Sequence, residues 1–276
     1  MDTSDLAKRM KDYEMRDRYF LQKRIPVAIR VDMRAGHTFT KGFERPFDKV
    51  FMKSMQETAK YMCENMGNAK FAYVQSDEIT IILVDYDTLE TDCWFNYRTD
   101  KLCSISASMA TMAFNKFFYK NVEEYSESVA VLQDFDIEKK YLEKLDKAAE
   151  KGAIFDARVF NIPKEEVTNL IYWRQLDATR NSIQMVGQAN FSHKQLQRKS
   201  CNDIQNMLLT EKDINWNNFP TTMKRGSCCI RNCRVCKPYD NAVLAPGLPI
   251  GEWFIDNEIP IFKDEGREYI EQLINF

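Results

Sequence analysis

Residues 71–84 read FAYVQSDEITIILV, two apolar runs separated by a short polar segment. Both runs are rich in β-branched and aromatic residues, so they predict two strands joined by a tight turn. The turn carries two adjacent carboxylates, Asp77 and Glu78, and no Asn-Gly or Asp-Gly pair explains it as a hairpin loop. Carboxylates beside buried strands are costly without a positive partner. The stretch therefore predicts either a metal site or a solvated hairpin tip.

A third carboxylate favours the metal site. Residues 25–31 read IPVAIRV, a further short apolar run, and Asp32 follows it directly. A sheet that brings such strand ends together groups the carboxylates, and hard oxygen ligands of this kind suit Mg²⁺. Two Mg²⁺ ions activate an attacking oxygen and stabilise a leaving one. The pattern predicts a two-metal site for phosphoryl transfer.

Length and composition set the limits of these interpretations. The chain has 276 residues, 44% of them hydrophobic, which leaves room for one large domain or two small ones. A net charge of −2 gives no whole-chain signal for nucleic acid. We find no run of 18 apolar residues and hence expect no membrane span. The densely charged N-terminus lacks the apolar segment of a signal peptide, so we expect a cytoplasmic protein with free thiols.

Four of the eight cysteines lie close together, at positions 228, 229, 233 and 236. The Cys233-x-x-Cys236 spacing, with one of the two preceding thiols, is compatible with a zinc site. No second paired motif accompanies it, and Cys228-Cys229 lies in a segment that reads as a strand. Zinc binding and free thiols both remain open.

The order of predicted elements indicates the fold. Between the strands described above we predict a helix over 48–66, and after them a helix over 93–119 and a strand over 155–160. The order strand, helix, strand, strand, helix, strand is the split βαβ, or ferredoxin-like, order. Polymerase palm domains share it. We predict an α+β fold: a ferredoxin-like palm over 1–162, with an antiparallel sheet and helices on one face. This region begins with a charged helix over 2–22.

The remaining residues, 163–276, differ in charge. Between positions 167 and 239 there are 11 Lys plus Arg against 4 Asp plus Glu, so the rest of the chain carries −9. This asymmetry predicts that residues 163–276 bind a polyanion. We expect this basic region to contain helices and strands and to pack on the palm, either as a second domain or as part of one continuous domain. The interleaved aromatics Tyr172, Trp173 and Trp216 suit base stacking. The alternative is a solvated basic face over an aromatic core.

Seven short motifs, in their order and spacing, make the chain resemble the tRNA-His guanylyltransferases and their bacterial, archaeal and phage guanylyltransferase-like relatives. The motifs are R-x-D at 30–32, H-T-F-T at 37–40, R-P-F-D at 45–48, Q-S-D-E at 75–78, R-x-x-K at 98–101, W-R-Q-x-D at 173–177, and N-x-N-N ahead of K-R-G at 215–226. The resemblance covers nearly the whole chain. It implies a nucleotidyltransferase that adds nucleotides to the 5′ end of tRNA, in the 3′-to-5′ direction, on a polymerase-like palm.

The resemblance also implies roles for the carboxylates. Asp32 and Asp77 resemble the residues that bridge two Mg²⁺ ions, and Glu78 the adjacent carboxylate that completes the catalytic site. Position 33 supplies a backbone carbonyl ligand in the family, where it is usually Gly; here it is Met33.

Further residues resemble the family's nucleotide contacts, with ATP or GTP as substrates and activators. Those for the triphosphate are Ser76, Arg98 and Lys101, and those for the nucleotide pocket are His37, Arg45 and Asp48. Our candidates for tRNA contact are Arg174, Arg180, Asn181, Lys224 and Arg225. By resemblance we also expect a homotetramer.

One departure bears on the substrate. The eukaryotic enzymes carry H-I-N-N-L-Y-N just after W-R-Q-x-D, and here residues 179–185 read TRNSIQM, with Thr179 in place of the His and Asn181 retained. We therefore favour template-directed repair of 5′-truncated tRNA over addition of G−1 to tRNA-His. A non-catalytic tRNA-binding protein, with a metal site weakened at Met33, is a third possibility.

Overall fold

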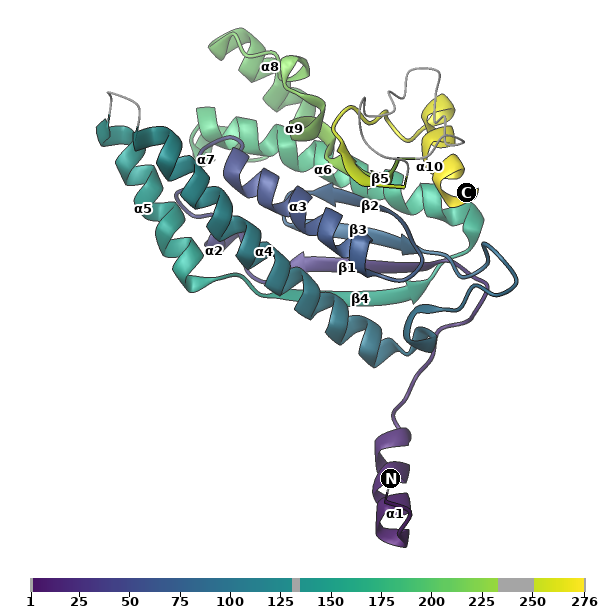
Figure 1. Cartoon of the computed structure of the whole chain (residues 1–276). Coiled ribbons are helices and arrows are strands. Elements are labelled where there is room, and N and C mark those ends of the chain that lie inside the picture. Colours follow the sequence, from purple (N-terminus) through teal and green to yellow (C-terminus); the bar gives the residue numbers. More distant parts are fainter. Residues whose placement is uncertain (1, 131–134, 233–250, 276) are drawn as a thin grey trace.

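A single antiparallel sheet forms the centre of the molecule (Figure 1). The computed structural model describes residues 2–130, 135–232 and 251–275. Its six strands follow the order β4-β1-β3-β2-β5-β6 across the sheet. They are β1 (Val27–Met33), β2 (Ala69–Gln75), β3 (Glu78–Leu83), β4 (Phe155–Asn161), β5 (Ser227–Arg231) and β6 (Trp253–Asp256).

The predicted palm is confirmed. Between β1 and β2 runs α3 (Lys49–Asn65), and between β3 and β4 run α4 (Thr99–Ala130) and α5 (Phe135–Lys151). The first four strands thus lie in the order 4-1-3-2 that the split βαβ pattern produces. The second long helix starts later than predicted, because a 3-10 turn, η1 (Trp94–Tyr97), precedes it and places Phe95 and Asn96 in left-handed backbone.

The larger core lies between the sheet and the helices α3 and α4. Alternate residues of the strands, such as Ile29 and Ile81, point to this face and pack against methionines and phenylalanines of the two helices. Met55 and Met62 are fully buried here, which makes them core residues. Asp48 caps α3 by accepting a hydrogen bond from the Phe51 N–H at 2.8 Å.

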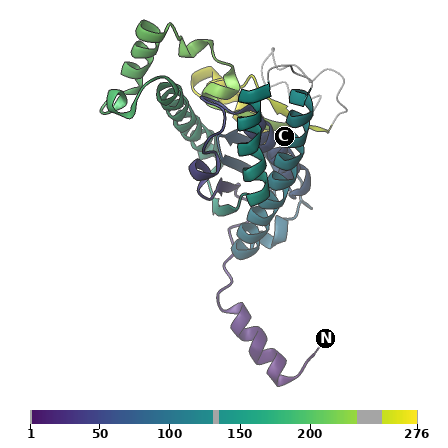
Figure 2. The same ribbon diagram turned by 90° about the vertical axis from the view of Figure 1, so that its left-hand side faces the viewer.

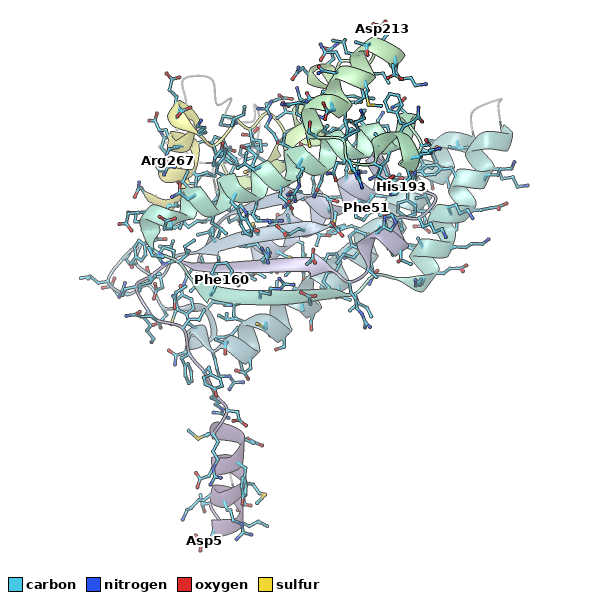
Figure 3. The ribbon with its side chains drawn as sticks, turned by 180° about the vertical axis from the view of Figure 1, so that it is seen from behind. Asp5, Phe51, Phe160, His193, Asp213 and Arg267 are labelled. Atoms are coloured by element: carbon cyan, nitrogen blue, oxygen red, sulfur yellow. The ribbon has the colours of Figure 1, made fainter. Side chains whose placement is uncertain are left out.

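A second layer of helices covers part of the opposite face, in addition to the helices predicted on one face. Here α6 (Val167–Asn190) and α10 (Arg267–Asn275) pack on a second apolar cluster that includes Ala28, Tyr73 and Ile82. Figure 3 shows α6 crossing this face. The outer strand is left more open, since Asp156 and Arg158 of β4 are exposed on the same face. A polar end of the sheet therefore remains accessible.

The second half of α6 carries a small helical lobe. It consists of α7 (His193–Leu196), α8 (Cys201–Lys212), η3 (Trp216–Asn218) and α9 (Thr221–Arg225). Ile183 and Val186 of α6 pack against Ile204 of α8 in a third apolar cluster. A Cβ added at Gly187 would lie 2.8 Å from the Ile204 side chain, so α8 approaches α6 closely at that glycine. Figure 2 shows α8 standing out from the sheet.

The first helix, α1 (Asp5–Met15), is shorter than the predicted 2–22 and contains no buried residue. It projects away from the rest of the chain (Figures 1 and 2). The remaining turns are a short helix α2 (Gly36–Phe39) and the 3-10 turns η2 (Lys164–Glu166) and η4 (Asp264–Gly266). Among the described helices, none combines the length and the apolar character that crossing a membrane requires.

The cysteine cluster is only partly described. Cys228 and Cys229 are free thiols buried in β5. Cys233 and Cys236 lie outside the described residues, so the zinc hypothesis stays a prediction.

The aromatic centre of the larger core predicts a strong effect of one substitution. Phe114 is fully buried and stacks on Phe118 with ring centroids 5.4 Å apart. We expect Phe114→Ala to lower the free energy of unfolding by about 3–5 kcal/mol, because it leaves a cavity. Met112→Ala, on the exposed side of the same helix, should change it by less than about 0.5 kcal/mol. Urea unfolding of both variants measures this; similar losses for the two would contradict it.

Candidate active site

Strand pairing places three carboxylates in one row. Asp32 on the central strand β1 lies opposite Glu78 on β3 and opposite Asp156 on β4. Directly paired residues of a sheet share a face, so all three side chains lie on the face that α6 crosses. Asp77 lies beside them in the β2–β3 turn, where its carbonyl accepts a hydrogen bond from the Met33 N–H at 3.1 Å. The structure thus brings Asp32 together with the turn, as the sequence suggested.

This grouping perturbs the carboxylates. Burial, and then the negative charges of Asp77, Glu78 and Asp156, raise the pKa of Asp32 to about 6. Burial also raises the pKa of Asp77. Burial is the larger cause of both shifts, and repulsion from neighbouring carboxylates adds to it, most clearly at Asp32. A cation at this point would relieve the repulsion.

A glycine allows the chain to pass close to Asp77. A Cβ added at Gly36, the first residue of α2, would lie only 2.0 Å from Asp77 Oδ2. A residue with a side chain at this position would therefore push either the loop or the carboxylate aside. The close approach explains why a small residue is needed four positions after Asp32.

The residues present fit Mg²⁺ bound together with phosphates. Asp32 and Asp77 offer two carboxylates, and the Met33 carbonyl is the third oxygen that the resemblance implies. Met33 ends β1 in extended backbone with its side chain buried in the core, so a residue other than glycine adopts this conformation. In the described parts of the chain, no three His, Cys, Asp or Glu side chains converge as a ready-made metal site. Mg²⁺ commonly takes one or two carboxylates and completes its shell with water and substrate phosphates.

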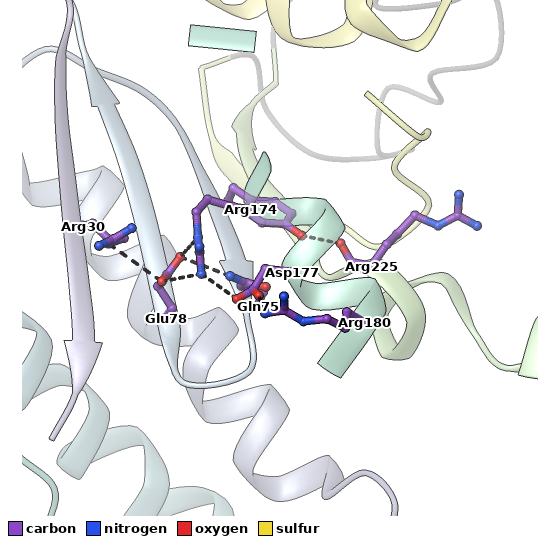
Figure 4. Close-up of polar contacts among 8 residues, drawn as sticks. Arg30, Gln75, Glu78, Arg174, Asp177, Arg180 and Arg225 are labelled. Carbon is purple, nitrogen blue, oxygen red and sulfur yellow. Dashed lines mark hydrogen bonds and ion pairs between the residues drawn. The ribbon is translucent and has the colours of Figure 1, made fainter. Parts of the chain in front are cut away.

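Glu78 is held by two arginines. Arg174 of α6 donates to it twice, from Nε to Oε1 at 2.7 Å and from Nη2 to Oε2 at 2.9 Å (Figure 4). Arg30 Nε lies 3.8 Å from Oε2, and Arg174 also donates to Asp177 at 2.9 Å. Arg174 is only 8% exposed. The pair joins α6 to the turn, and the roles of Glu78 toward metal and of Arg174 toward RNA stay predictions.

A cavity of about 470 Å³ opens beside the turn. Gln75 and Ser76 of the turn form one wall, and the loop before α3, the middle of α6 and α9 form the others. Seven of the predicted site residues line it: His37, Arg45, Asp48, Ser76, Asn181, Lys224 and Arg225. Four of the six predicted nucleotide contacts and three of the five predicted RNA contacts therefore meet in one place.

Several predicted site residues form hydrogen bonds or ion pairs with other groups of the protein. Asp48 is buried and accepts a hydrogen bond from the Tyr141 hydroxyl at 2.6 Å, in addition to capping α3. Lys224 Nζ donates to the Asn217 carbonyl at 2.6 Å, and burial with the neighbouring Arg225 lowers the pKa of Lys224. Arg180 is 61% exposed and pairs with Asp177. Gln75, a further residue of the Q-S-D-E motif, was not among the predicted site residues; its Nε2 donates to Glu78 Oε1 at 3.1 Å.

Two predicted triphosphate contacts lie elsewhere. Arg98 stands at the start of α4, next to the segment that leads into β1: Leu21 N–H donates to the Tyr97 carbonyl, and Arg98 forms a bridge with Phe20. Asp32 lies at the other end of β1. Arg98 pairs with Asp100 at 2.8 Å, and Lys101 lies over the Phe95 ring. Within this single chain Arg98 and Lys101 lie away from the β2–β3 turn, so their role toward the triphosphate stays a prediction.

Comparison with known proteins decides the family. The sequence profile of the tRNAHis guanylyltransferase family matches residues 7–163, more than half of the chain. The chain belongs to this family. Its members are nucleotidyltransferases, and so is this protein. The match ends before α6, so the profile does not cover the helical lobe.

Relatives extend the similarity beyond that match. The chain is similar to the tRNA(His) guanylyltransferase of Saccharomyces cerevisiae, 28% identical over 74% of this chain and 82% of the yeast protein. It also resembles two solved structures of bacterial tRNA(His) guanylyltransferase-like protein, one in complex with ATP and one with GTP. The first is 39% identical with a TM-score of 0.78, the second 35% identical with a TM-score of 0.74. Each covers 99% of this chain and 100% of its own, which confirms the family resemblance and the palm fold.

The Gly36 contact predicts a catalytic loss without unfolding. We expect Gly36→Ala to lower nucleotidyl transfer about a hundredfold, because a displacement of about 1 Å at a reacting centre has effects of that size. Ala35→Gly, in the same loop, leaves Asp77 in place and should retain activity. Thermal unfolding of both variants checks that they are folded. Full activity of Gly36→Ala would show that Asp77 does not need its present position.

The raised pKa of Asp32 predicts a pH-dependent stability difference. In the folded state Asp32 holds its proton up to about pH 6, whereas its ordinary pKa is 3.8, so folding becomes less favourable as pH rises through this window. Asp32→Asn removes the charge. Without divalent cation we expect its Tm to exceed that of the wild type at pH 7.5 and to equal it near pH 4.

Added Mg²⁺ should raise the Tm of the wild type more than that of Asp32→Asn, because ligand binding stabilises only the form that binds. Asp12→Asn, on the exposed α1, is the control and should behave as the wild type. If the Tm of Asp32→Asn, compared with that of the wild type, were lower at pH 7.5 than at pH 4, this account of Asp32 would be contradicted.

Proposed function

We propose that this protein adds nucleotides to the 5′ end of truncated tRNA, in the 3′-to-5′ direction and under the direction of a template. One observation carries the proposal: the turn at residues 75–78 is both a wall of the cavity and the support of the carboxylates. A nucleotide in the cavity would present its phosphates to Asp32 and Asp77. The similar bacterial structures with ATP and with GTP support a nucleotide there.

The chemistry follows from these groups. Mg²⁺ held by Asp32, Asp77 and the Met33 carbonyl would supply charge stabilisation to the transferring phosphoryl group. Arg45, Lys224 and Arg225 surround the cavity with positive charge that attracts and orients phosphates. A 5′-monophosphate carries no good leaving group, so ATP or GTP must activate it first, whereas a 5′-triphosphate needs no activation. In both cases the 3′-hydroxyl of the incoming nucleotide attacks the 5′-terminal phosphorus of the RNA in line. The leaving group is the activating nucleoside monophosphate in the first case and pyrophosphate in the second, and catalysis depends mainly on positioning.

Residues 163–276 would then bind the RNA. Lys224 and Arg225 of α9 line the cavity, and Arg180 is exposed on α6. Phosphate contacts of this kind give affinity independent of sequence. We accordingly assign catalysis to residues 1–162 and RNA binding to residues 163–276.

A second candidate is the addition of G−1 to tRNA-His. The family's description and the similarity to the yeast enzyme favour it. Thr179, where the eukaryotic motif has histidine, and the higher identity to the bacterial guanylyltransferase-like protein favour repair.

An extension assay tests the proposal. The protein, Mg²⁺ and all four NTPs are mixed with a tRNA that lacks its first nucleotide and carries a 5′-triphosphate. We expect extension by the templated base and a loss of at least about a hundredfold in Asp77→Ala, because the loss of a metal ligand removes charge stabilisation. Affinity of Asp77→Ala for tRNA should stay within about twofold of the wild type.

The remaining outcomes separate the alternatives. Failure on truncated tRNA, with guanylylation of full-length tRNA-His lacking G−1, would replace repair by G−1 addition. Binding of tRNA with neither reaction would leave a tRNA-binding protein. Equal activity of Asp77→Ala and the wild type would refute the proposed catalytic site.

A further inference from the structure

A second cavity, of about 440 Å³, lies beside the first. It is bounded by the end of α6, by α7 and by the first turn of α8, in the lobe that the family profile does not cover. Its floor is apolar and includes Phe191 and Ile204, which are buried. Its rim is polar, and every charged side chain on it is basic or a histidine.

The rim carries three amide side chains, those of Gln184, Gln188 and Gln197. All three are exposed, and none forms a side-chain hydrogen bond with another described residue. Gln184 and Gln188 are four residues apart on α6 and so project from the same side of the helix. By contrast, Gln175 on the same helix donates to the Pro260 carbonyl and accepts from the Phe262 N–H, both at 2.9 Å.

Unoccupied amides over an apolar floor suit a nucleobase. Each amide offers both a donor and an acceptor, the combination that the edges of unpaired RNA bases require. The apolar floor suits the face of a base. Lys199 and Arg45 complete the rim. Neither forms a salt bridge within the described chain, although Lys199 is near enough to Asp203 to help lower the pKa of that carboxyl group. Both cations face the cavity, where they can attract a phosphate.

The two cavities adjoin. Arg45 and Gln188 line both of them, so a ligand in one is a close neighbour of a ligand in the other. The first cavity reaches the turn at Ser76, whereas the second reaches outward along exposed residues of the lobe. Adjacent nucleotide-sized cavities, one at the carboxylates and one farther out, match a polymer whose end is at the reacting centre.

We propose that the second cavity binds a nucleotide of the RNA substrate, with its base against the three glutamines and its phosphate at Lys199 and Arg45. This rests on the proposed function in one respect, that the substrate is RNA. A free NTP shares the chemistry of a nucleotide, and the outward position of the cavity favours the RNA.

A matched pair of double variants tests this proposal. Gln184→Ala with Lys199→Ala removes one amide and one cation from the rim. Gln205→Ala with Lys194→Ala removes the same groups from the same lobe, outside both cavities. Binding of a 5′-phosphorylated truncated tRNA is measured by fluorescence anisotropy, and binding of GTP by equilibrium dialysis. Thermal unfolding verifies that each protein is folded.

We expect the rim variant to bind tRNA about tenfold more weakly than the wild type, as the loss of one base contact and one phosphate contact implies. The control should stay within about twofold, and both should bind GTP as the wild type does. Equal weakening in both variants would indicate a general effect of charge and overturn the proposal. So would unchanged tRNA binding, or weakened GTP binding with tRNA binding unchanged.

The binding result is independent of the extension assay. A protein that shows this pattern but extends no tRNA would retain the RNA site and refute the proposed reaction. A protein that extends tRNA while the rim variant binds it normally would retain the reaction and refute the site.

Discussion

The buried ion pair between Glu78 and Arg174 joins the two parts of the molecule. The removal of two charges from water costs several kcal/mol for each ion, and the mutual attraction offsets this cost only when the geometry is good. Here two hydrogen bonds of 2.7 and 2.9 Å provide that geometry. The main effect of such a pair is orientation rather than net stability. It fixes α6 against the β2–β3 turn, and both cavities depend on that arrangement because each uses α6 as a wall.

The net charge of −2 is the sum of acidic and basic groups that gather in different parts of the structure. Carboxylates gather at the polar end of the sheet, where burial and then their mutual repulsion raise the pKa of Asp32. Cations gather on α6, on α9 and on the turns of the lobe. The cavity is lined by cations and by residues 75 and 76 of the segment that carries Asp77 and Glu78. Of these two carboxylates, Glu78 is neutralised by arginines. A highly charged ligand, with phosphates and with cations bound to them, suits this volume better than a neutral one.

Much of the fold was predictable because it depends on local patterns. The apolar runs predicted the strands, Asp48 predicted the start of α3, and the order of the elements predicted the topology of the sheet. Contacts that depend on distant segments were not predictable in the same way. The sequence places Arg174 in a basic region, whereas the fold buries it against Glu78, 96 residues away. Arg98 and Lys101 resemble phosphate contacts, yet the direction of α4 takes them to the far end of the sheet. The close approach at Gly36 follows only from the folded loop.

The strand β5 pairs with β2, so segments from both halves of the chain share one sheet. Without β5, the strand β2 would become an edge, with a row of unpaired backbone donors and acceptors beside Tyr73. The apolar face that α6 and α10 now cover would be exposed at the same time. The palm is therefore not a self-sufficient module that can be cut from this chain and moved elsewhere. Residues 1–162 and the segments that follow them share one sheet and one apolar cluster, so we expect them to fold as one unit.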